Sequence, residues 1–167
     1  YRQILSQGDN SAGYFIGYEP GGTMRVFHNW QNIPVQYPFG EWVHIAVVSD
    51  QNYGTKLYLN GVLEAQTSLT GLPNSGLFRI GRQWQGNSHY YEDWFGKIDD
   101  VQVWDVSLTD QEIINYMNCP PSGNEPGLIG YWNFEEGSGN TAFDLTSNGN
   151  DGTINGATYD NNVPSQS

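Results

Sequence analysis

The chain has 167 residues, of which 37% are hydrophobic and 14% aromatic, so it can bury one core of ordinary size and is not disordered over most of its length. Six Lys and Arg stand against 18 Asp and Glu, and the resulting formal charge of -12 opposes binding to nucleic acid or anionic lipid. No apolar run approaches the roughly 20 residues that a membrane-spanning helix needs, and the single cysteine excludes an internal disulfide.

Short strands are expected along most of the chain. The 21 Gly and eight Pro break the sequence every few residues, and aromatic and β-branched residues lie between the breaks. The expected strands are residues 2–6, 13–18, 23–28, 42–49, 56–59, 63–67, 77–80 and 96–104, followed after a helix at 109–118 by strands at 128–134 and 153–158.

Three local patterns are informative. Both faces of residues 42–48 are largely apolar, which favours a strand in the middle of a sandwich. The pair Asn60-Gly61 predicts a type I′ hairpin turn, because both central positions of that turn need a positive φ. At the predicted helix, Ser107 or Thr109 can cap the N-terminus, with acidic residues following.

Five motifs occur in one order: GEWVHIAVV at 40–48, KLYLNGV at 56–62, FRIGR at 78–82, FGKIDDVQVW at 95–104 and SLTDQEI at 107–113. Together they resemble the laminin-G-like, concanavalin A-like lectin/glucanase jelly-roll family, in the style of bacterial tandem modules. The resemblance covers about residues 3–118. It implies an all-β fold, a two-sheet antiparallel jelly-roll β-sandwich with one short helix, of a kind that binds glycans or proteins.

The last third of the chain resembles the same family out of its usual position. The stretches GLIGYWNFEEGSG at 127–139 and DLTSNGNDGT at 144–153 look like the opening of such a domain, which normally comes first. We therefore expect a main domain at 1–119, a linker at 120–127, strands at 128–160 and a tail at 161–167. Residues 128–160 either complete this module or begin the next one, and a neighbouring domain or chain could supply missing strands instead.

A calcium site is expected in the loop at 144–152, where Asp, Asn and Ser oxygens alternate with glycines. The resemblance adds that this loop, with an acid from the strand near residue 99, often encloses a structural Ca²⁺. The alternative is a solvated turn. The expected ligands are Asp144, Asn148, Asn150, Asp151 and Asp99.

A glycan site is expected in the segment 83–94, which mixes aromatic rings with amides and carboxylates. Rings stack on the C–H faces of sugars, and polar side chains pair with the hydroxyl groups. Trp94 is expected to pack inward, and an ordinary packed loop is the alternative for the whole segment. The expected contact residues are Trp84, Asn87, Tyr90 and Tyr91, with a second candidate at His28 and Trp30.

The acidic residues do not predict catalysis. Jelly-roll glycosidases carry two carboxylates on one strand face, whereas the acids at 92–93, 99–100 and 135–136 are adjacent and point to opposite faces. His44 lies among apolar residues and is read as a core or interface histidine.

We therefore expect a non-catalytic, extracellular or cell-surface module of a larger protein that binds a polysaccharide or glycoconjugate with calcium support. The alternative is a structural or protein-protein adhesion domain that binds no sugar. Neither reading includes nucleic acid or membrane insertion.

Overall fold

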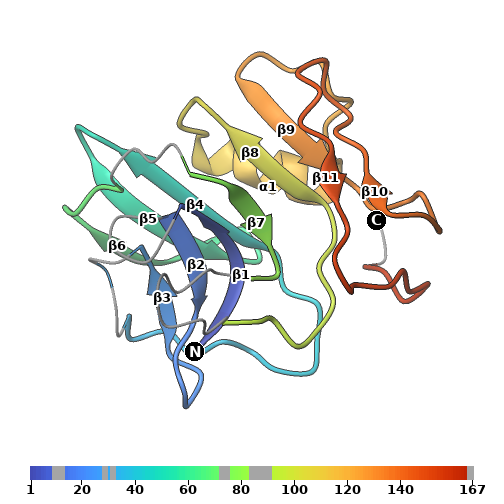
Figure 1. Ribbon diagram of the computed structural model, residues 1–167. Helices are drawn as coiled ribbons and strands as arrows, with labels where there is room; N and C mark the ends of the chain where they lie inside the picture. Colours follow the sequence, from blue (N-terminus) through green and yellow to red (C-terminus); the bar gives the residue numbers. More distant parts are fainter. Residues whose placement is uncertain (9–13, 28–29, 31–32, 72–75, 83–91, 165–167) are drawn as a thin grey trace. The chain divides into compact units, whose positions relative to one another are not determined.

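A computed structural model of the chain describes residues 1–8, 14–27, 30, 33–71, 76–82 and 92–164 (Figure 1). The chain divides into two compact units, Tyr1–Lys97 and Ile98–Ser167, here called unit 1 and unit 2. Each unit is described by itself.

The described residues of unit 1 form two antiparallel sheets. The first has the strand order β3-β2-β1-β7 and the second has the order β4-β5-β6. The strands are β1 (Arg2–Gln7), β2 (Tyr14–Tyr18), β3 (Met24–Val26), β4 (Ile45–Asp50), β5 (Gly54–Leu59), β6 (Val62–Thr67) and β7 (Phe78–Ile80).

The core of unit 1 lies between these two sheets. Met24 and Val26 in β3, and Leu57 and Leu59 in β5, are two residues apart, so each pair lies on one face of its strand. Buried residues from β3, from the segment that follows it and from β5 form one hydrophobic cluster, and side chains from β2 and β4 pack against it. The cluster consists of Met24, Val26, Phe27, Ile33, Val35, Leu57 and Leu59. Unit 1 is therefore a sandwich of two sheets.

The predicted hairpin turn is confirmed. Asn60 and Gly61 have φ values of 49° and 76°, and Leu59 pairs with Val62 across the turn. The expectation for residues 42–48 is only partly met, because β4 begins at Ile45, lies at one end of its sheet and is half-buried along its length. The central strand β5 takes the buried position instead.

Unit 2 contains two short antiparallel sheets and one helix among its described residues. β8 (Val101–Trp104) pairs with β9 (Leu128–Trp132), and β10 (Thr141–Ala142) pairs with β11 (Gly152–Thr153). Between β8 and β9 lies α1 (Asp110–Asn118). Thr109 caps this helix in a capping box with Glu112, which confirms one of the two predicted caps.

Only Thr153 of the expected strand at 153–158 lies in a strand, as the second residue of β11, and β10 is a strand that the sequence did not indicate. Glycines and short polar residues dominate this region, so its alternation is too brief to predict strands. The assignment of residues 128–160 to this module or to the next stays a prediction.

Charge is distributed unequally between the two units. Unit 1 holds all six Lys and Arg residues and seven Asp and Glu, so its formal charge is -1. Unit 2 holds eleven Asp and Glu and neither Lys nor Arg, so its formal charge is -11. The acidity of the chain therefore belongs almost entirely to unit 2.

The predicted all-β class with a short helix is confirmed, since α1 is the one α-helix in the described ranges. Within those ranges, no helix is both long and apolar enough to cross a membrane.

Candidate functional site

Most of the predicted glycan contacts lie outside the described residues. Trp84, Asn87, Tyr90, Tyr91 and His28 belong to this group. Trp30 is described, and its half-buried side chain packs against the core cluster of unit 1. Its carbonyl oxygen accepts a hydrogen bond of 2.9 Å from the N–H of Val26. Trp30 therefore supports the core of the sandwich.

Four other aromatic residues of unit 1 contact one another. We call Tyr18, Tyr37, Phe39 and Trp94 the aromatic cluster. Tyr18 and Tyr37 are stacked with ring centroids 5.1 Å apart, and Phe39 meets each of them near a right angle at 5.2 Å. Trp94 meets Tyr18 at 5.7 Å and Tyr37 at 5.5 Å, also edge to face. These separations lie in the range in which aromatic pairs attract one another.

Backbone hydrogen bonds position this cluster. Tyr18 is the last residue of β2, and the N–H of Tyr37 donates to the carbonyl of Gly22 at 2.7 Å. Gly22 has a φ of 89°, and a Cβ there would lie 2.9 Å from the Phe39 ring. Glycine thus lets the ring approach the backbone. Phe39 is 62% exposed, so one member of the cluster faces solvent.

Trp94 is held at both of its nitrogen atoms. Its backbone N–H donates to Gly81 at 2.8 Å, and its indole N–H donates to the carbonyl of Lys97 at 3.3 Å. It is half-buried, in line with its expected inward packing. The cluster joins residues 18, 37, 39 and 94, which no local pattern in the sequence relates to one another.

A buried polar group lies on the sheet β3-β2-β1-β7. Gln3, Gly17 and Arg25 pair with one another across β1, β2 and β3. Because Gly17 has no side chain, the side chain of Gln3 lies over the Gly17 backbone. Glu92 accepts a hydrogen bond from Gln3 and lies 3.6 Å from the Arg25 guanidinium.

The Arg25 guanidinium also lies over the rings of Tyr1 and Phe15, at 4.4 and 4.3 Å. Burial lowers the pKa of Arg25, and the negative charges of Glu92 and Glu19 oppose that shift. The charge of Arg25 is therefore balanced inside unit 1 by those two carboxylates.

Residues 92–94 are anchored one after another. Glu92 contacts Arg25, Asp93 accepts hydrogen bonds from Arg82 at 2.6 and 3.2 Å, and Trp94 enters the aromatic cluster. The Arg82–Asp93 pair is bidentate, which fixes the relative orientation of the two side chains. Because each of these three adjacent residues contacts a different partner, the backbone at 92–94 is fixed in position.

In unit 2, the predicted calcium loop is closed by hydrogen bonds to Asp144. Its Oδ1 accepts from the N–H groups of Tyr131 and Thr146, both at 3.0 Å. Its Oδ2 accepts from the Thr146 hydroxyl at 2.8 Å and from the N–H of Asn150 at 2.9 Å. Burial alone would raise the pKa of Asp144, but the hydrogen bonds from Thr146, Tyr131 and Asn150 lower it.

The other predicted ligands have different neighbours. The side-chain amides of Asn148 and Asn150 both donate to the carbonyl of Ile129, at 3.2 and 2.7 Å. Asp151 accepts from the N–H of Asp144, and Asp99 is influenced by Asp100 and Glu135 rather than by the loop.

Across the described ranges, no three or more His, Cys, Asp or Glu side chains form a group that could hold a metal ion. Because the lone pairs of Asp144 already accept four donors, this arrangement does not fit a cation bound by Asp144. Calcium binding by the loop residues Asn148, Asn150 and Asp151, and by Asp99, stays a prediction.

The negative charges of Asp100 and Glu135 act on Asp99, which precedes β8. Burial, together with the charges of Asp100 and Glu135, raises the pKa of Asp99 to about 6. Tyr131 donates its hydroxyl to Asp100 at 2.7 Å, and burial with that bond raises its pKa. The resemblance implied a calcium role for Asp99, and the influence of Glu135 on its pKa could not be predicted because the two residues lie far apart in the sequence.

His44 is half-buried in unit 1. Its backbone N–H donates to the side-chain oxygen of Asn60 at 2.9 Å, and burial lowers the pKa of its imidazole. These features agree with a histidine that is neutral at pH 7 and packed within the fold.

The comparisons with known proteins give one result. A family model described as the concanavalin A-like lectin/glucanases superfamily matches residues 1–114. Neither a search of curated proteins nor a search of solved structures found a match. The match covers the five motifs and both sheets of unit 1. The chain therefore belongs to the concanavalin A-like lectin/glucanase superfamily, of laminin-G-like type.

Proposed function

We propose that this chain is a non-catalytic carbohydrate-binding module and that the aromatic cluster of unit 1 contacts the sugar. The observation that carries the proposal is the gathering of four rings from three separate segments, with the Phe39 ring 62% exposed. Membership of a superfamily that includes lectins supports it.

The geometry of the cluster suits a sugar ring. A pyranose presents an apolar C–H face, and an exposed aromatic ring removes that face from water without breaking hydrogen bonds. The tyrosines of the cluster add hydroxyl groups that can donate to and accept from sugar hydroxyls. Because Trp94 and Tyr37 hold the rings in place, little conformational entropy is lost on binding.

The two acids that precede Trp94 in the chain support a non-catalytic role. Glu92 and Asp93 each form an ion pair, with Arg25 and Arg82 respectively. A glycosidase needs one carboxyl group that donates a proton and a second that faces the sugar freely. We further propose that the module acts outside the cell or at its surface, as part of a larger protein.

Binding to a glycan array followed by calorimetry with the best ligand tests this proposal. Phe39→Ala removes the exposed ring, and we expect about a tenfold loss of affinity, which corresponds to about 1.4 kcal/mol. Tyr53→Ala is the matched control, because Tyr53 is 81% exposed on the turn between β4 and β5 and lies outside the cluster. Equal affinity of the two variants would refute the assignment of the site.

The same array tests the earlier glycan prediction. Trp84→Ala removes a ring of the segment 83–91, whose structure is outside the described ranges. If Trp84→Ala abolishes binding and Phe39→Ala does not, the site belongs to that segment. Repeating the array with EDTA shows whether calcium takes part.

Protein-protein adhesion is the second candidate function. The exposed apolar rings of Phe39 and Phe95, which are 62% and 73% exposed, also suit a protein interface. Absence of binding to every glycan, together with self-association that Phe39→Ala abolishes, would favour adhesion over sugar recognition.

A further inference from the structure

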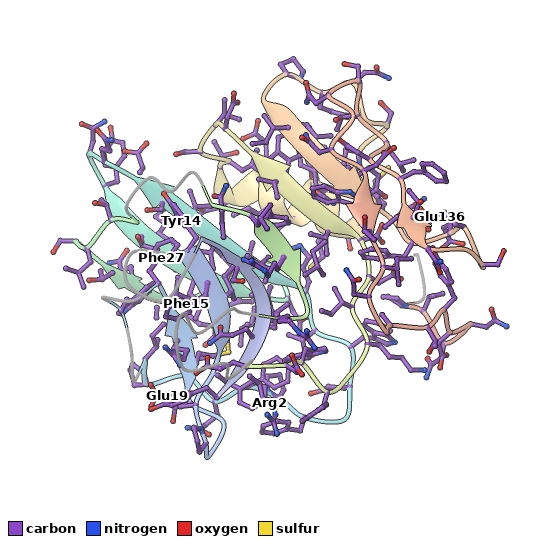
Figure 2. All side chains as sticks on the ribbon, viewed as in Figure 1. Arg2, Tyr14, Phe15, Glu19, Phe27 and Glu136 are labelled. Carbon is purple, nitrogen blue, oxygen red and sulfur yellow. The ribbon has the colours of Figure 1, made fainter. Side chains whose placement is uncertain are left out.

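Arg2 lies at the edge of the aromatic cluster. It pairs directly with Tyr18 across β1 and β2, so the two side chains lie on the same face of the sheet. Its guanidinium lies 4.1 Å from the centre of the Phe95 ring, and Phe95 follows Trp94 in the chain. Figure 2 shows Arg2 and Glu19 at the end of unit 1 where β1 begins and β2 ends. The positively charged guanidinium of Arg2 therefore lies next to the aromatic cluster.

The charge of Arg2 is not balanced by a carboxylate in the described part of the chain. Its one hydrogen bond there goes from Nη1 to the carbonyl of Tyr1, at 3.3 Å. Glu19 and Glu92 both act on Arg25, and Asp93 pairs with Arg82. The guanidinium therefore keeps donors that an incoming anion can use.

The distribution of charge over unit 1 favours the same conclusion. All four arginines of this acidic chain, Arg2, Arg25, Arg79 and Arg82, lie in the sheet β3-β2-β1-β7 or directly after β7. Unit 1 has a formal charge of -1, so it does not repel an anion as unit 2 does. A positive group beside stacking rings suits a ligand that combines an apolar ring face with a negative charge.

We infer that the ligand of this site is an acidic polysaccharide, whose sugar ring stacks on the aromatic cluster and whose carboxylate is bound by Arg2. This inference rests on the proposed carbohydrate binding and adds the class of sugar. A uronic acid has both features on one ring: a C–H face for Phe39 and Tyr18, and a carboxylate for the guanidinium. A neutral glycan would leave Arg2 without an anionic partner.

The test compares acidic polysaccharides with esterified forms that lack the negative charge. Polygalacturonate and alginate are compared with their esters, in which each carboxylate is neutral. We expect the acidic forms to bind about tenfold more tightly than the esters at low salt, and the difference to shrink as NaCl screens the pair. Arg2→Gln should abolish the preference, Arg2→Lys should restore part of it, and Lys56→Gln, which also removes one positive charge from unit 1, should keep it.

The outcomes separate this inference from the proposed function. Equal binding of acid and ester, with a loss in Phe39→Ala, would overturn the role of Arg2 and leave carbohydrate binding standing. A preference for the acid that survives in Arg2→Gln would also overturn it. If the unaltered chain binds none of these polymers and no glycan on the array, both proposals fail. Circular dichroism of each variant verifies that the sandwich has formed.

Discussion

Replacement of Asp144 tests how the loop at 144–151 of unit 2 is stabilised. Its two carboxylate oxygens accept four hydrogen bonds, and the bonds from the Tyr131 and Thr146 N–H groups are buried. In Asp144→Ala all four donors lose their acceptor. The Thr146 hydroxyl can rotate and the N–H of Asn150 can reach water, so the two buried N–H groups dominate the cost.

The expected magnitude follows from those two groups. A buried donor left without a partner costs about 1–3 kcal/mol, so Asp144→Ala should lower the free energy of unfolding by about 4 kcal/mol. Asp144→Asn keeps one oxygen that can accept from the N–H groups of Tyr131 and Thr146. Its amide nitrogen then faces the N–H of Asn150, and because both are donors they cannot form a hydrogen bond. We expect a loss of about 2 kcal/mol for this change.

Urea unfolding followed by tryptophan fluorescence measures these losses. Trp132 is a suitable reporter, because it is buried in β9 and its indole N–H donates to the carbonyl of Asn150 at 3.1 Å. Asp151→Asn is the matched control, since the hydrogen bond that Asp151 accepts from the N–H of Asp144 can equally go to an amide oxygen. Its cost should be below about 1 kcal/mol.

The reasoning would be refuted if Asp144→Ala cost no more than Asp151→Asn. Adding Ca²⁺ or EDTA is the second arm of the experiment. If the loop is closed by its own donors, the unfolding midpoint should be unchanged by either addition. A midpoint that rises with Ca²⁺ in the unaltered chain, and not in Asp144→Ala, would show that Asp144 is a metal ligand after all.

Three further predictions concern stability. The pKa of Asp99 is raised to about 6, so its contribution to stability is present below its unfolded pKa and is lost as the pH rises through 6. In chemical unfolding, Asp99→Asn should therefore stabilise the chain by about 1 kcal/mol at pH 7.5, after solvent screening, and should have no effect at pH 4. Burial lowers the pKa of His44, so stability is lost as the pH falls below the pKa of this histidine in the unfolded chain. His44→Phe should therefore reduce the change in the thermal unfolding midpoint between pH 7.5 and pH 5. Gly17→Ala would place a Cβ against the carbonyl of Arg2 and should cost about 2–3 kcal/mol in urea, whereas Gly152→Ala, whose Cβ would have ordinary contacts at 3.7 Å, should cost much less.

Local features of the fold could be predicted because their causes are local. Asn60 and Gly61 tolerate positive φ wherever they occur, and Thr109 and Glu112 are three residues apart, as a capping box requires. The aromatic and β-branched residues between Gly and Pro also indicate short strands without reference to the rest of the chain.

Features that depend on distant segments could not be predicted in the same way. Nothing near Trp94 indicates that it contacts Tyr18 and Tyr37, and nothing near Asp99 indicates Glu135. The Asp and Asn residues at 144–151 suit either a cation or a set of N–H donors, since both need the same oxygen atoms. Only the positions of the backbone N–H groups of Tyr131, Thr146 and Asn150 distinguish the two arrangements.

The pairing of β8 with β9 affects how this protein can be shortened. Residues 1–114 match the family, but Val101, Gln102 and Val103 find their antiparallel partners at Trp132, Tyr131 and Gly130. A fragment truncated at residue 114 or 119 would leave one side of β8 open, and an open strand edge recruits other chains. Anyone who expresses the matched region alone should therefore expect aggregates, and soluble material should return when the gene is extended through residue 160.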